Sequence, residues 1–279
     1  MSLSVASLNS GSNGNCYYIG NCSDAVLVDA GISCKEVEKR MTRLGLPLSK
    51  VRAIFISHEH NDHTSGVTVM ANKLNVPIYI SHSTYTKSGL QLQEGQRQYY
   101  EAFKPIILGD LVITAFPKFH DAIDPHSFTI SCLGVNVGVY TDIGSICENV
   151  IKQFSQCHAA FLETNYDEKM LESGNYPRFL KNRISGAMGH LSNNQALELF
   201  RLHRSPLLSH LFLSHLSKNN NCPDLVSDLF SKHSKGVKII VASRHSETPL
   251  YVLSSPQNPG SVRILKIPPK QLAFPFSRI

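Results

Sequence analysis

Four potential metal ligands fall within six residues of the chain. His58, His60, Asp62 and His63 directly follow an apolar run at residues 51–57. A strand that feeds a short polar turn is a place where a buried sheet can present a metal site. Imidazole nitrogens suit borderline ions such as zinc, and a neighbouring carboxylate suits zinc, manganese or iron. The spacing therefore predicts a site for two metal ions rather than one closed site.

Three further candidate ligands each follow a predicted strand. They are His120, after residues 113–119, Asp142, after residues 137–141, and His215, after residues 208–214. We expect these side chains to leave the sheets at the same edge as His58, so that seven groups converge.

Three rival residues have the right chemistry at less suitable positions. His126 competes with His120, and Asp124 competes with Asp142, but neither rival directly follows a predicted strand. His210 competes with His215, yet it falls inside an apolar run, where a packed side chain is expected. Position therefore favours the first three residues as ligands.

The elements that must position these groups form two similar halves of strand-like and helix-like segments. Short strands are expected at residues 5–8, 16–19, 25–28, 53–56, 77–80, 111–116, 127–130, 135–140, 159–162, 207–213 and 237–241. Helices are expected at residues 33–45, 66–74, and from residues 192 and 223 onward. Ser33 and Ser192 are suitable N-caps, each followed three residues later by Glu36 or Gln195.

No linker or low-complexity break divides the chain. We therefore expect residues 1–279 to form one domain with two sheets sandwiched between helices. Residues 266–279 contain three prolines and are expected to form an irregular tail. The Gly-rich turn at residues 9–15 lacks the helix entry and the lysine of a phosphate loop, so a tight hairpin at the rim of the site is its expected role.

The bulk composition is that of a globular protein. The chain has 279 residues, of which 42% are hydrophobic and 17% charged. Its seven cysteines are odd in number and include no CxxC pair, which favours reduced thiols in a cytosol over a disulfide framework. No signal peptide and no run of roughly 20 apolar residues is evident, so we expect a cytoplasmic protein without a membrane span.

Charge is divided unevenly between the two halves. Residues 1–150 hold 11 Lys and Arg against 13 Asp and Glu, whereas residues 151–279 hold 16 against 8, so the halves carry about −2 and +8. A basic half attracts polyanions such as nucleic acid through a field that does not depend on sequence. The alternative is an ordinary solvated surface, because no block of like charges stands out.

The ligand pattern resembles the metallo-β-lactamase superfamily. Residues 58–63 reproduce its HxHxDH signature in full, and a predicted strand ending in Asp29 precedes them. His120, Asp142 and His215 match in order the later histidine, the bridging aspartate and the last histidine of the superfamily. The resemblance implies an α/β fold, a four-layer αββα sandwich of two mixed sheets between helices.

Shorter motifs resemble one group within that superfamily, the YycJ/WalJ group of bacterial exonuclease-like proteins. The matching segments are residues 9–16, 120–125, 189–193 and 213–220. The resemblance extends from residue 1 to about residue 255.

The resemblance also implies how the ligands divide between two divalent ions, which in such sites lie about 3.5 to 4 Å apart and activate a shared water. The first ion is assigned to His58, His60 and His120, the second to Asp62, His63 and His215, and Asp142 is the bridge. The ligand set favours zinc by ligand type and also accepts manganese or iron. Asp29 lies on another strand and is expected to orient a histidine or the backbone rather than to bind metal.

Glu163 and His190 resemble the glutamate and histidine that flank the site in tRNA 3′-processing relatives. There the carboxylate orients an imidazolium that protonates the leaving alkoxide, a contribution worth about 10² to 10⁴ in rate. Together with Asp62 they are the predicted catalytic residues. The alternative for His190 is a residue at a helix entry without catalytic work.

Three functions compete for this site. The first is a phosphodiesterase that trims DNA or RNA ends, the second a glyoxalase II-like or lactonase-like hydrolase, and the third a regulatory protein without turnover. Only 22 residues separate His120 from Asp142, and 21 separate Asp142 from Glu163, which leaves no room for the arm of tRNA-processing relatives or the inserted domain of mRNA-cleaving ones. The Glu163 and His190 pair and the basic second half favour a compact nuclease with nucleic acid as its substrate.

Overall fold

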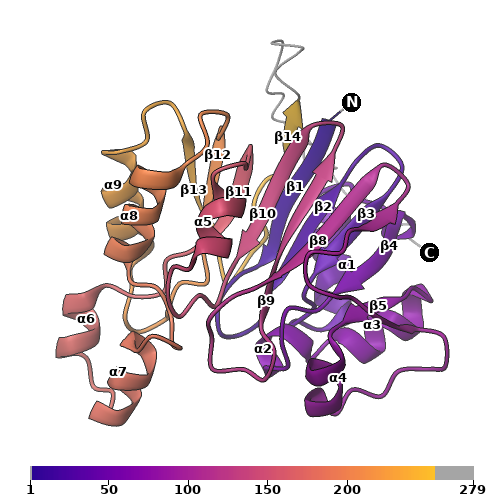
Figure 1. Ribbon diagram of the computed structural model, residues 1–279, viewed down its shortest axis with the longest axis horizontal. Helices are drawn as coiled ribbons and strands as arrows, with labels where there is room; N and C mark the ends of the chain where they lie inside the picture. The colour runs from indigo at the N-terminus through magenta and orange to yellow at the C-terminus, as the bar shows by residue number, and fades with distance from the viewer. Residues whose placement is uncertain (1, 255–279) are drawn as a thin grey trace, which may run out of the picture.

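Two mixed sheets, packed face to face between layers of helices, form the centre of the structure (Figure 1). The computed structural model describes residues 2–254. The predicted four-layer fold is confirmed, whereas the predicted tail at residues 266–279 lies outside the described residues.

Each sheet has seven strands among the described residues. In spatial order the first sheet contains β14 (Tyr251–Ser254), β1 (Ser2–Asn9), β2 (Cys16–Gly20), β3 (Ala25–Val28), β4 (Val51–Phe55), β5 (Ile78–Ile80) and β6 (Arg97–Tyr99). The second contains β13 (Lys238–Val241), β12 (His210–Ser214), β11 (Ala159–Glu163), β10 (Val135–Tyr140), β9 (His126–Cys132), β8 (Leu111–Pro117) and β7 (Ile106–Leu108).

Both sheets change from antiparallel to parallel pairing at their centre. The strands from β3 to β6 pair in parallel in the first sheet, and those from β10 to β13 do so in the second. The carboxyl ends of parallel strands meet at one edge, which is where open α/β sheets bind ligands. The loops after β3, β4, β10, β11 and β12 therefore carry the residues that can build a site.

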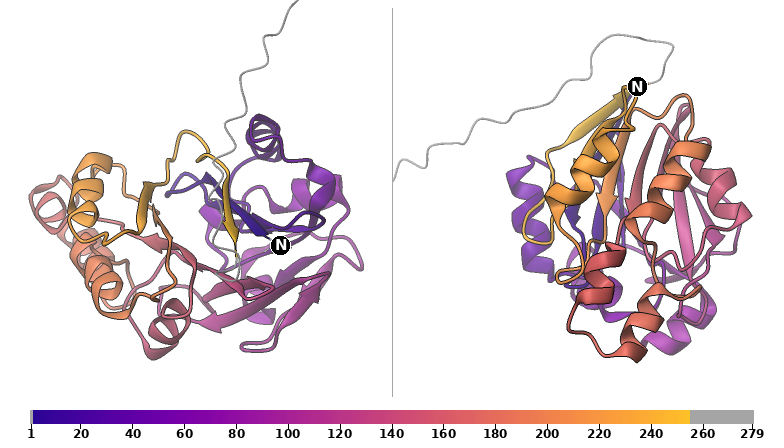
Figure 2. Two further views of the ribbon diagram at one scale, coloured as in Figure 1. Left: turned by 90° about the horizontal axis from the view of Figure 1, so that it is seen from above. Right: turned by 90° about the vertical axis from the view of Figure 1, so that its left-hand side faces the viewer.

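Helices cover the outer face of each sheet (Figures 1 and 2). The helices are α1 (Cys34–Arg43), α2 (Asn61–Thr64), α3 (Val67–Leu74), α4 (His82–Ser88), α5 (Glu148–Phe154), α6 (Glu168–Ser173), α7 (Arg178–Ser185), α8 (Asn193–His203), α9 (Pro223–Ser231) and a 3₁₀ turn at Leu48–Lys50. Two predicted N-caps are confirmed: the Ser33 hydroxyl accepts from the Glu36 amide at 3.3 Å, and Ser192 with Gln195 forms a complete capping box.

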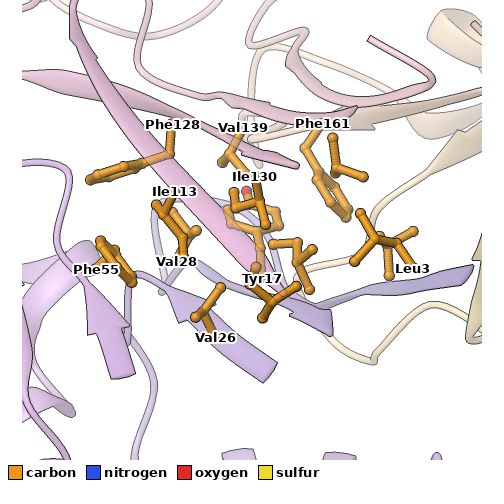
Figure 3. Close-up of a cluster of buried hydrophobic side chains, with 14 of the residues drawn as sticks. Leu3, Tyr17, Val26, Val28, Phe55, Ile113, Phe128, Ile130, Val139 and Phe161 are labelled. Carbon is orange, nitrogen blue, oxygen red and sulfur yellow. The ribbon is translucent and has the colours of Figure 1, made fainter. Parts of the chain in front are cut away.

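Three buried apolar clusters separate the four layers. The central cluster lies between the sheets and contains Tyr17 and Phe161, with ring centroids 4.9 Å apart, and Phe55 and Phe128, 5.7 Å apart (Figure 3). The other two clusters lie under the helices of each outer layer. Each large side chain in them contributes about 1.5–3 kcal/mol through burial, so the sheet edges that carry the ligands are held on a rigid base.

Several short elements were not predicted from the sequence. Residues 81–110 contain α4, β6 and β7, and residues 148–185 contain α5, α6 and α7. Strand β6 is exposed throughout, and α7 buries none of its residues. Helices and strands that bury few side chains have no regular apolar pattern in their sequence from which they could be predicted.

In residues 2–254, no helix has both the length and the apolar character that crossing a membrane requires. All seven cysteines are free thiols; four of them are buried and Cys22 is exposed.

Candidate metal centre

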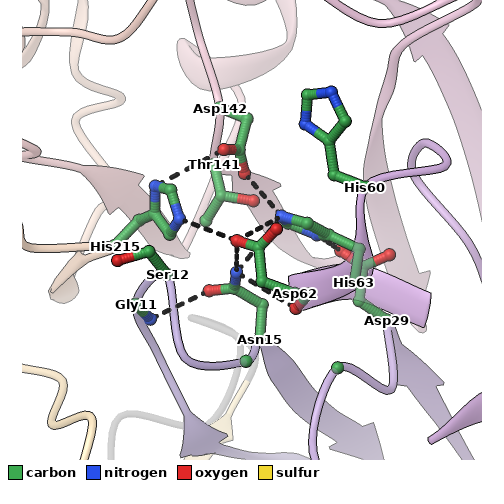
Figure 4. Close-up of polar contacts among 12 residues, drawn as sticks. Gly11, Ser12, Asn15, Asp29, His60, Asp62, His63, Thr141, Asp142 and His215 are labelled. Atoms are coloured by element: carbon green, nitrogen blue, oxygen red, sulfur yellow. Dashed lines mark hydrogen bonds and ion pairs between the residues drawn. The ribbon is translucent and has the colours of Figure 1, made fainter. Parts of the chain in front are cut away.

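The seven predicted ligands gather at the carboxyl edge of the parallel strands. His58 and His60 follow β4, Asp62 and His63 lie in α2, His120 follows β8, Asp142 follows β10, and His215 follows β12. Segments far apart in the sequence therefore meet at one end of the sandwich, where Figure 4 shows His63, Asp62, Asp142 and His215 pointing toward one another.

These side chains form two adjacent clusters. One cluster contains His58, His60 and His120, and the other contains Asp62, His63, Asp142 and His215; within each, one ligand atom per residue lies within 4.8 Å of the others. The Asp142 carboxylate reaches both, since Oδ2 lies 3.0 Å from His63 Nε2 and Oδ1 lies 3.8 Å from His120 Nε2. The structure thus places Asp142 where a bridge between two ions would stand.

The backbone is left-handed at three residues of the site. Asp29, Asp142 and His215 have φ values of 60°, 54° and 56°. This conformation costs a residue with a side chain about 1–3 kcal/mol and persists only when its surroundings impose it. Here the amide of Asp142 donates to Glu163 Oε1 at 3.1 Å, and the amide of His215 donates to Ser10 Oγ at 2.8 Å. Each turn away from a strand is therefore held by another part of the site.

Three of the histidines are fixed through Nδ1. His63 Nδ1 donates to Asp29 Oδ2 at 2.7 Å, which confirms the orienting role predicted for Asp29. His120 Nδ1 donates to the carbonyl of Gly189, and His215 Nδ1 donates to Glu163 Oε1, both at 2.9 Å. An acceptor at Nδ1 fixes the tautomer that leaves Nε2 able to bind a metal.

The first cluster has the donor atoms and protonation that a metal needs. His58 Nε2 and His60 Nδ1 lie 3.1 Å apart, close to the ~3.3 Å between two nitrogens of a tetrahedral zinc site with bonds of about 2.0–2.1 Å. The buried Nε2 of His120 has no hydrogen-bond partner within residues 2–254. Burial, reinforced by His63, holds the pKa of His58 well below its ordinary value, and burial lowers the pKa of His120 to about 4. The neutral imidazoles of His58 and His120, and the unpartnered Nε2 of His120, fit a divalent ion.

The second cluster is held together by charge when no metal is bound. Burial by itself lowers the pKa of His215, but Asp142, Asp62 and Glu163 outweigh it and raise the pKa to about 10. Burial also opposes a charge on His63, yet the surrounding carboxylates raise its pKa well above the ordinary value, and Asp142 has the largest effect among them. Both side chains are therefore in the charged imidazolium form at neutral pH in the metal-free protein.

Metal uptake by the metal-free protein is expected to release protons at pH 7, because His63 and His215 must become neutral to bind an ion. Their raised pKa values place both groups in the charged, protonated form at pH 7. For each proton that the metal displaces, the apparent affinity for the metal should fall by up to about tenfold when the pH is lowered by one unit. Titration calorimetry in two buffers of different ionisation enthalpy measures the release. Asp142→Asn removes the carboxylate that raises both pKa values most, so this variant should release fewer protons per bound ion. A binding enthalpy independent of buffer, with affinity equal at pH 6 and pH 8, would contradict this expectation.

Glu163 organises more of the site than the sequence indicated. Its side chain is fully buried, and Oε1 accepts from His190 Nδ1 at 2.9 Å, as the predicted pairing requires. The same oxygen lies 2.9 Å from His215 Nδ1, while Oε2 accepts from the amides of Ile143 and Leu191. Burial raises the pKa of Glu163, but His190 and His215 outweigh burial and hold the pKa at about 2. One carboxylate therefore positions both a predicted ligand and the predicted acid.

Asn15 is a residue of the site that the sequence did not reveal. Its Nδ2 lies 3.2 Å from Asp62 Oδ2 and 3.1 Å from His63 Nε2, and its backbone amide donates to the Asp62 carbonyl at 2.7 Å. A Cβ on Gly31 would lie 1.7 Å from that same carbonyl, so only glycine permits the close approach. The Gly-rich turn thus contacts the second cluster directly instead of only lining its rim. The Asn and Gly residues of this turn were the sequence signal that could have indicated its contact with the site.

Lys118 was also missed. It is buried directly after β8, two residues before His120, and its Nζ donates to the carbonyl of Thr141 at 2.5 Å. Burial lowers the pKa of Lys118. The carboxylates of the site oppose this effect, and Asp142 has the largest influence among them. The ammonium group therefore ties the loop that carries His120 to the loop that carries Asp142.

The three rival residues lie outside both clusters. His126 Nδ1 donates to the carbonyl of Asp124 at 2.9 Å. His210 is buried, with its ring centroid 5.3 Å from that of Tyr251, as expected for a packed side chain. The structure therefore separates these residues from the seven it brings together.

Comparison with known proteins adds independent information. Residues 10–137 match the model of the metallo-beta-lactamase superfamily. Over 244 residues the chain is 30% identical to exodeoxyribonuclease YycJ of Bacillus anthracis, covering 85% of this chain and 92% of that protein. Over 223 residues it is 31% identical to exodeoxyribonuclease WalJ of Streptococcus pneumoniae, covering 78% and 83%.

Solved structures agree on the fold. The metallo-beta-lactamase fold protein YhfI from Bacillus subtilis superposes with a TM-score of 0.68 at 16% identity, over 89% of this chain and 99% of that one. The short form of human tRNase Z superposes with a TM-score of 0.60 at 15% identity, over 88% and 98%.

Proposed function

Because the chain belongs to the metallo-β-lactamase superfamily, and within it to the family of the YycJ and WalJ exodeoxyribonucleases, we propose that it is a two-metal phosphodiesterase that removes nucleotides from DNA ends. The observation that supports this function is the hydrogen bond between Glu163 and His190 beside two clusters of side chains that could bind metal ions. A phosphodiester has a poor leaving group, for which a positioned acid is useful. A thioester or lactone needs such an acid less.

We propose that the two clusters hold two divalent ions. His58, His60 and His120 would bind one, Asp62, His63 and His215 the other, and Asp142 both. The imidazole-rich set favours zinc, with manganese or iron as alternatives. Ions held there supply Lewis acidity, which activates water and draws electron density from the phosphoryl oxygens.

Asp62 is the most exposed carboxylate of the clusters. Its side chain is 22% exposed, against 2% for Asp142, and Asn15 and His215 both contact Oδ2. Oδ1 has no hydrogen-bond partner in residues 2–254. Burial raises the pKa of Asp62, but His63 and His215 outweigh burial and hold the pKa well below its ordinary value in the metal-free protein. Asp62 would therefore act as a metal ligand and, once bound ions have displaced the protons of these imidazoles, as the acceptor of a hydrogen bond from the attacking water.

His190 would act as the acid, next to the ligands His120 and His215. Its ring centroid lies 5.2 Å from that of His120 and 5.3 Å from that of His215, and the side chain is 22% exposed. Glu163 accepts a hydrogen bond from Nδ1 of His190, which leaves the Nε2–H group to donate a proton to the leaving oxygen. The acid is therefore oriented by the same carboxylate that orients a ligand.

The wider context is proposed on the same basis. Both sheets supply ligands, which supports one functional domain. Seven free thiols and a DNA substrate support a cytoplasmic location.

Competition between substrate classes tests the proposed function. The metal-loaded protein is expected to shorten end-labelled DNA and to hydrolyse bis(p-nitrophenyl) phosphate, with much slower turnover of a glutathione thioester or a lactone. RNA of the same sequence serves as a parallel substrate that tests the preference for DNA. Rapid thioester or lactone hydrolysis without any phosphodiester cleavage would favour the small-molecule alternative instead.

A further inference from the structure

A cavity of about 300 Å³ adjoins the second ligand cluster. It is lined by residues 216–218 and Asn221 after β12, by Val241 at the end of β13 and residues 242–245 after it, by Pro223 at the start of α9, and by Ser10 directly after β1. Leu216, Val241 and Ala242 give it an apolar wall, and Lys218 and Arg244 supply positive charge. A mostly apolar hollow with a few polar groups is the usual character of a small-ligand site.

The cavity shares a wall with a predicted metal ligand. Leu216 directly follows His215, and the Ser10 hydroxyl, which accepts from the His215 amide at 2.8 Å, lines the cavity. Figure 4 shows the neighbouring Gly11 and Ser12 close to His215. A group that occupies the cavity therefore lies next to the place where phosphodiester cleavage is proposed.

Arg244 is built into this wall without a counter-ion. Its Nη2 donates to the carbonyl of Leu216 and to Ser12 Oγ, both at 3.2 Å. A Cβ on Gly11 would lie 2.8 Å from Nη2, and Gly11 has φ of 141°, so glycine lets the guanidinium approach the turn. In residues 2–254 no carboxylate forms an ion pair with Arg244 or Lys218. A fixed, partly buried guanidinium with unused N–H donors suits a phosphate.

We propose that this cavity binds the terminal nucleotide of the DNA strand, an inference that rests on the proposed function. Arg244, assisted by Lys218, pairs with a phosphate, and the apolar wall contacts the base and sugar. Ligand sites span about 300–1,000 Å³, so this cavity holds one nucleotide and excludes a duplex. A site that ends after one nucleotide would restrict the proposed cleavage to strand ends.

Arg244→Gln tests this assignment because glutamine keeps an amide donor for the Leu216 carbonyl while the charge is lost. KM for end-labelled single-stranded DNA is expected to rise about tenfold or more, as for the loss of a charged hydrogen bond. The slope of log KM against log salt should fall by about 0.7, the contribution of one phosphate contact on a single strand. Metal content should be retained, and the rate on DNA should fall more than the rate on bis(p-nitrophenyl) phosphate, because that ester has no nucleoside to contact the apolar wall.

Arg52→Gln is the matched control, because Arg52 lies on β4 with Asp24 3.5 Å away and does not line the cavity. The nucleotide site is overturned if wild type degrades DNA and Arg244→Gln shows the same KM and salt slope. If wild type degrades no DNA, the proposed function fails separately, and equilibrium dialysis then decides the site. Thymidine 5′-monophosphate should bind more tightly than inorganic phosphate, because only the nucleotide contacts the apolar wall, and both probes should bind more weakly to Arg244→Gln. Equal binding of the two probes to wild type, or unchanged binding of both to Arg244→Gln, would overturn the site.

Discussion

Asp142→Asn is expected to lower DNA cleavage by about 10³-fold or more and to leave at most one tightly bound metal ion. The Asp142 carboxylate reaches both ligand clusters, and its side chain is only 2% exposed. Asparagine has nearly the same volume and tolerates the left-handed backbone seen at this position. The loss should therefore come from charge rather than from unfolding.

Metal analysis beside a cleavage assay measures both effects in one preparation. Asp124→Asn is the control, because Asp124 is an aspartate on a neighbouring loop outside both clusters. It should retain two ions and full activity. Two tightly bound ions and near wild-type cleavage in Asp142→Asn would remove this residue from the metal centre.

His190→Ala is expected to slow DNA cleavage by about 10²- to 10⁴-fold while both metal ions remain bound. His190 contacts Glu163 and lies outside the two clusters assigned to metal, although it forms a further group of possible ligand atoms with Asp142, Glu163 and His215. Metal content of the variant therefore decides between the acid and a ligand. Hydrolysis of bis(p-nitrophenyl) phosphate should fall much less, because p-nitrophenolate leaves without being protonated. The ratio of the two rates therefore reports the proton donated to the leaving oxygen.

The matched control for this variant is His82→Ala, which removes an exposed histidine packed against Tyr99, with ring centroids 5.2 Å apart. Glu163→Gln is a less selective test, since Glu163 also holds His215. An equal loss on both substrates, or loss of a metal ion from His190→Ala, would show that His190 supports the metal centre and is not the acid.

The positions of the predicted ligands followed from the sequence because each stands directly after a strand or in the turn that the strand feeds. His58 and Asp142 follow buried runs whose composition marks them as strands, and the carboxyl ends of parallel strands meet at one edge. Local sequence therefore contained both the type of residue and its place. The two N-caps, Ser33 and Ser192, were predictable for the same local reason.

Features created by tertiary approach were not predictable. Asn15 meets Asp62, 47 positions further along the chain, only because the turn after β1 folds over α2. The double role of Glu163 depends on two loops that approach it from β12 and from α7. The left-handed turns at Asp29, Asp142 and His215 are held by such long-range contacts, so no local signal marks them.

The most direct measurement compares linear and circular single-stranded DNA of one sequence in the presence of metal-loaded protein. The proposed exodeoxyribonuclease should convert the linear strand to mononucleotides and leave the circle intact, and removal of the metal by a chelator should stop the reaction. Cleavage of the circle at a similar rate, or no cleavage of either DNA by protein that carries two ions, would contradict the account.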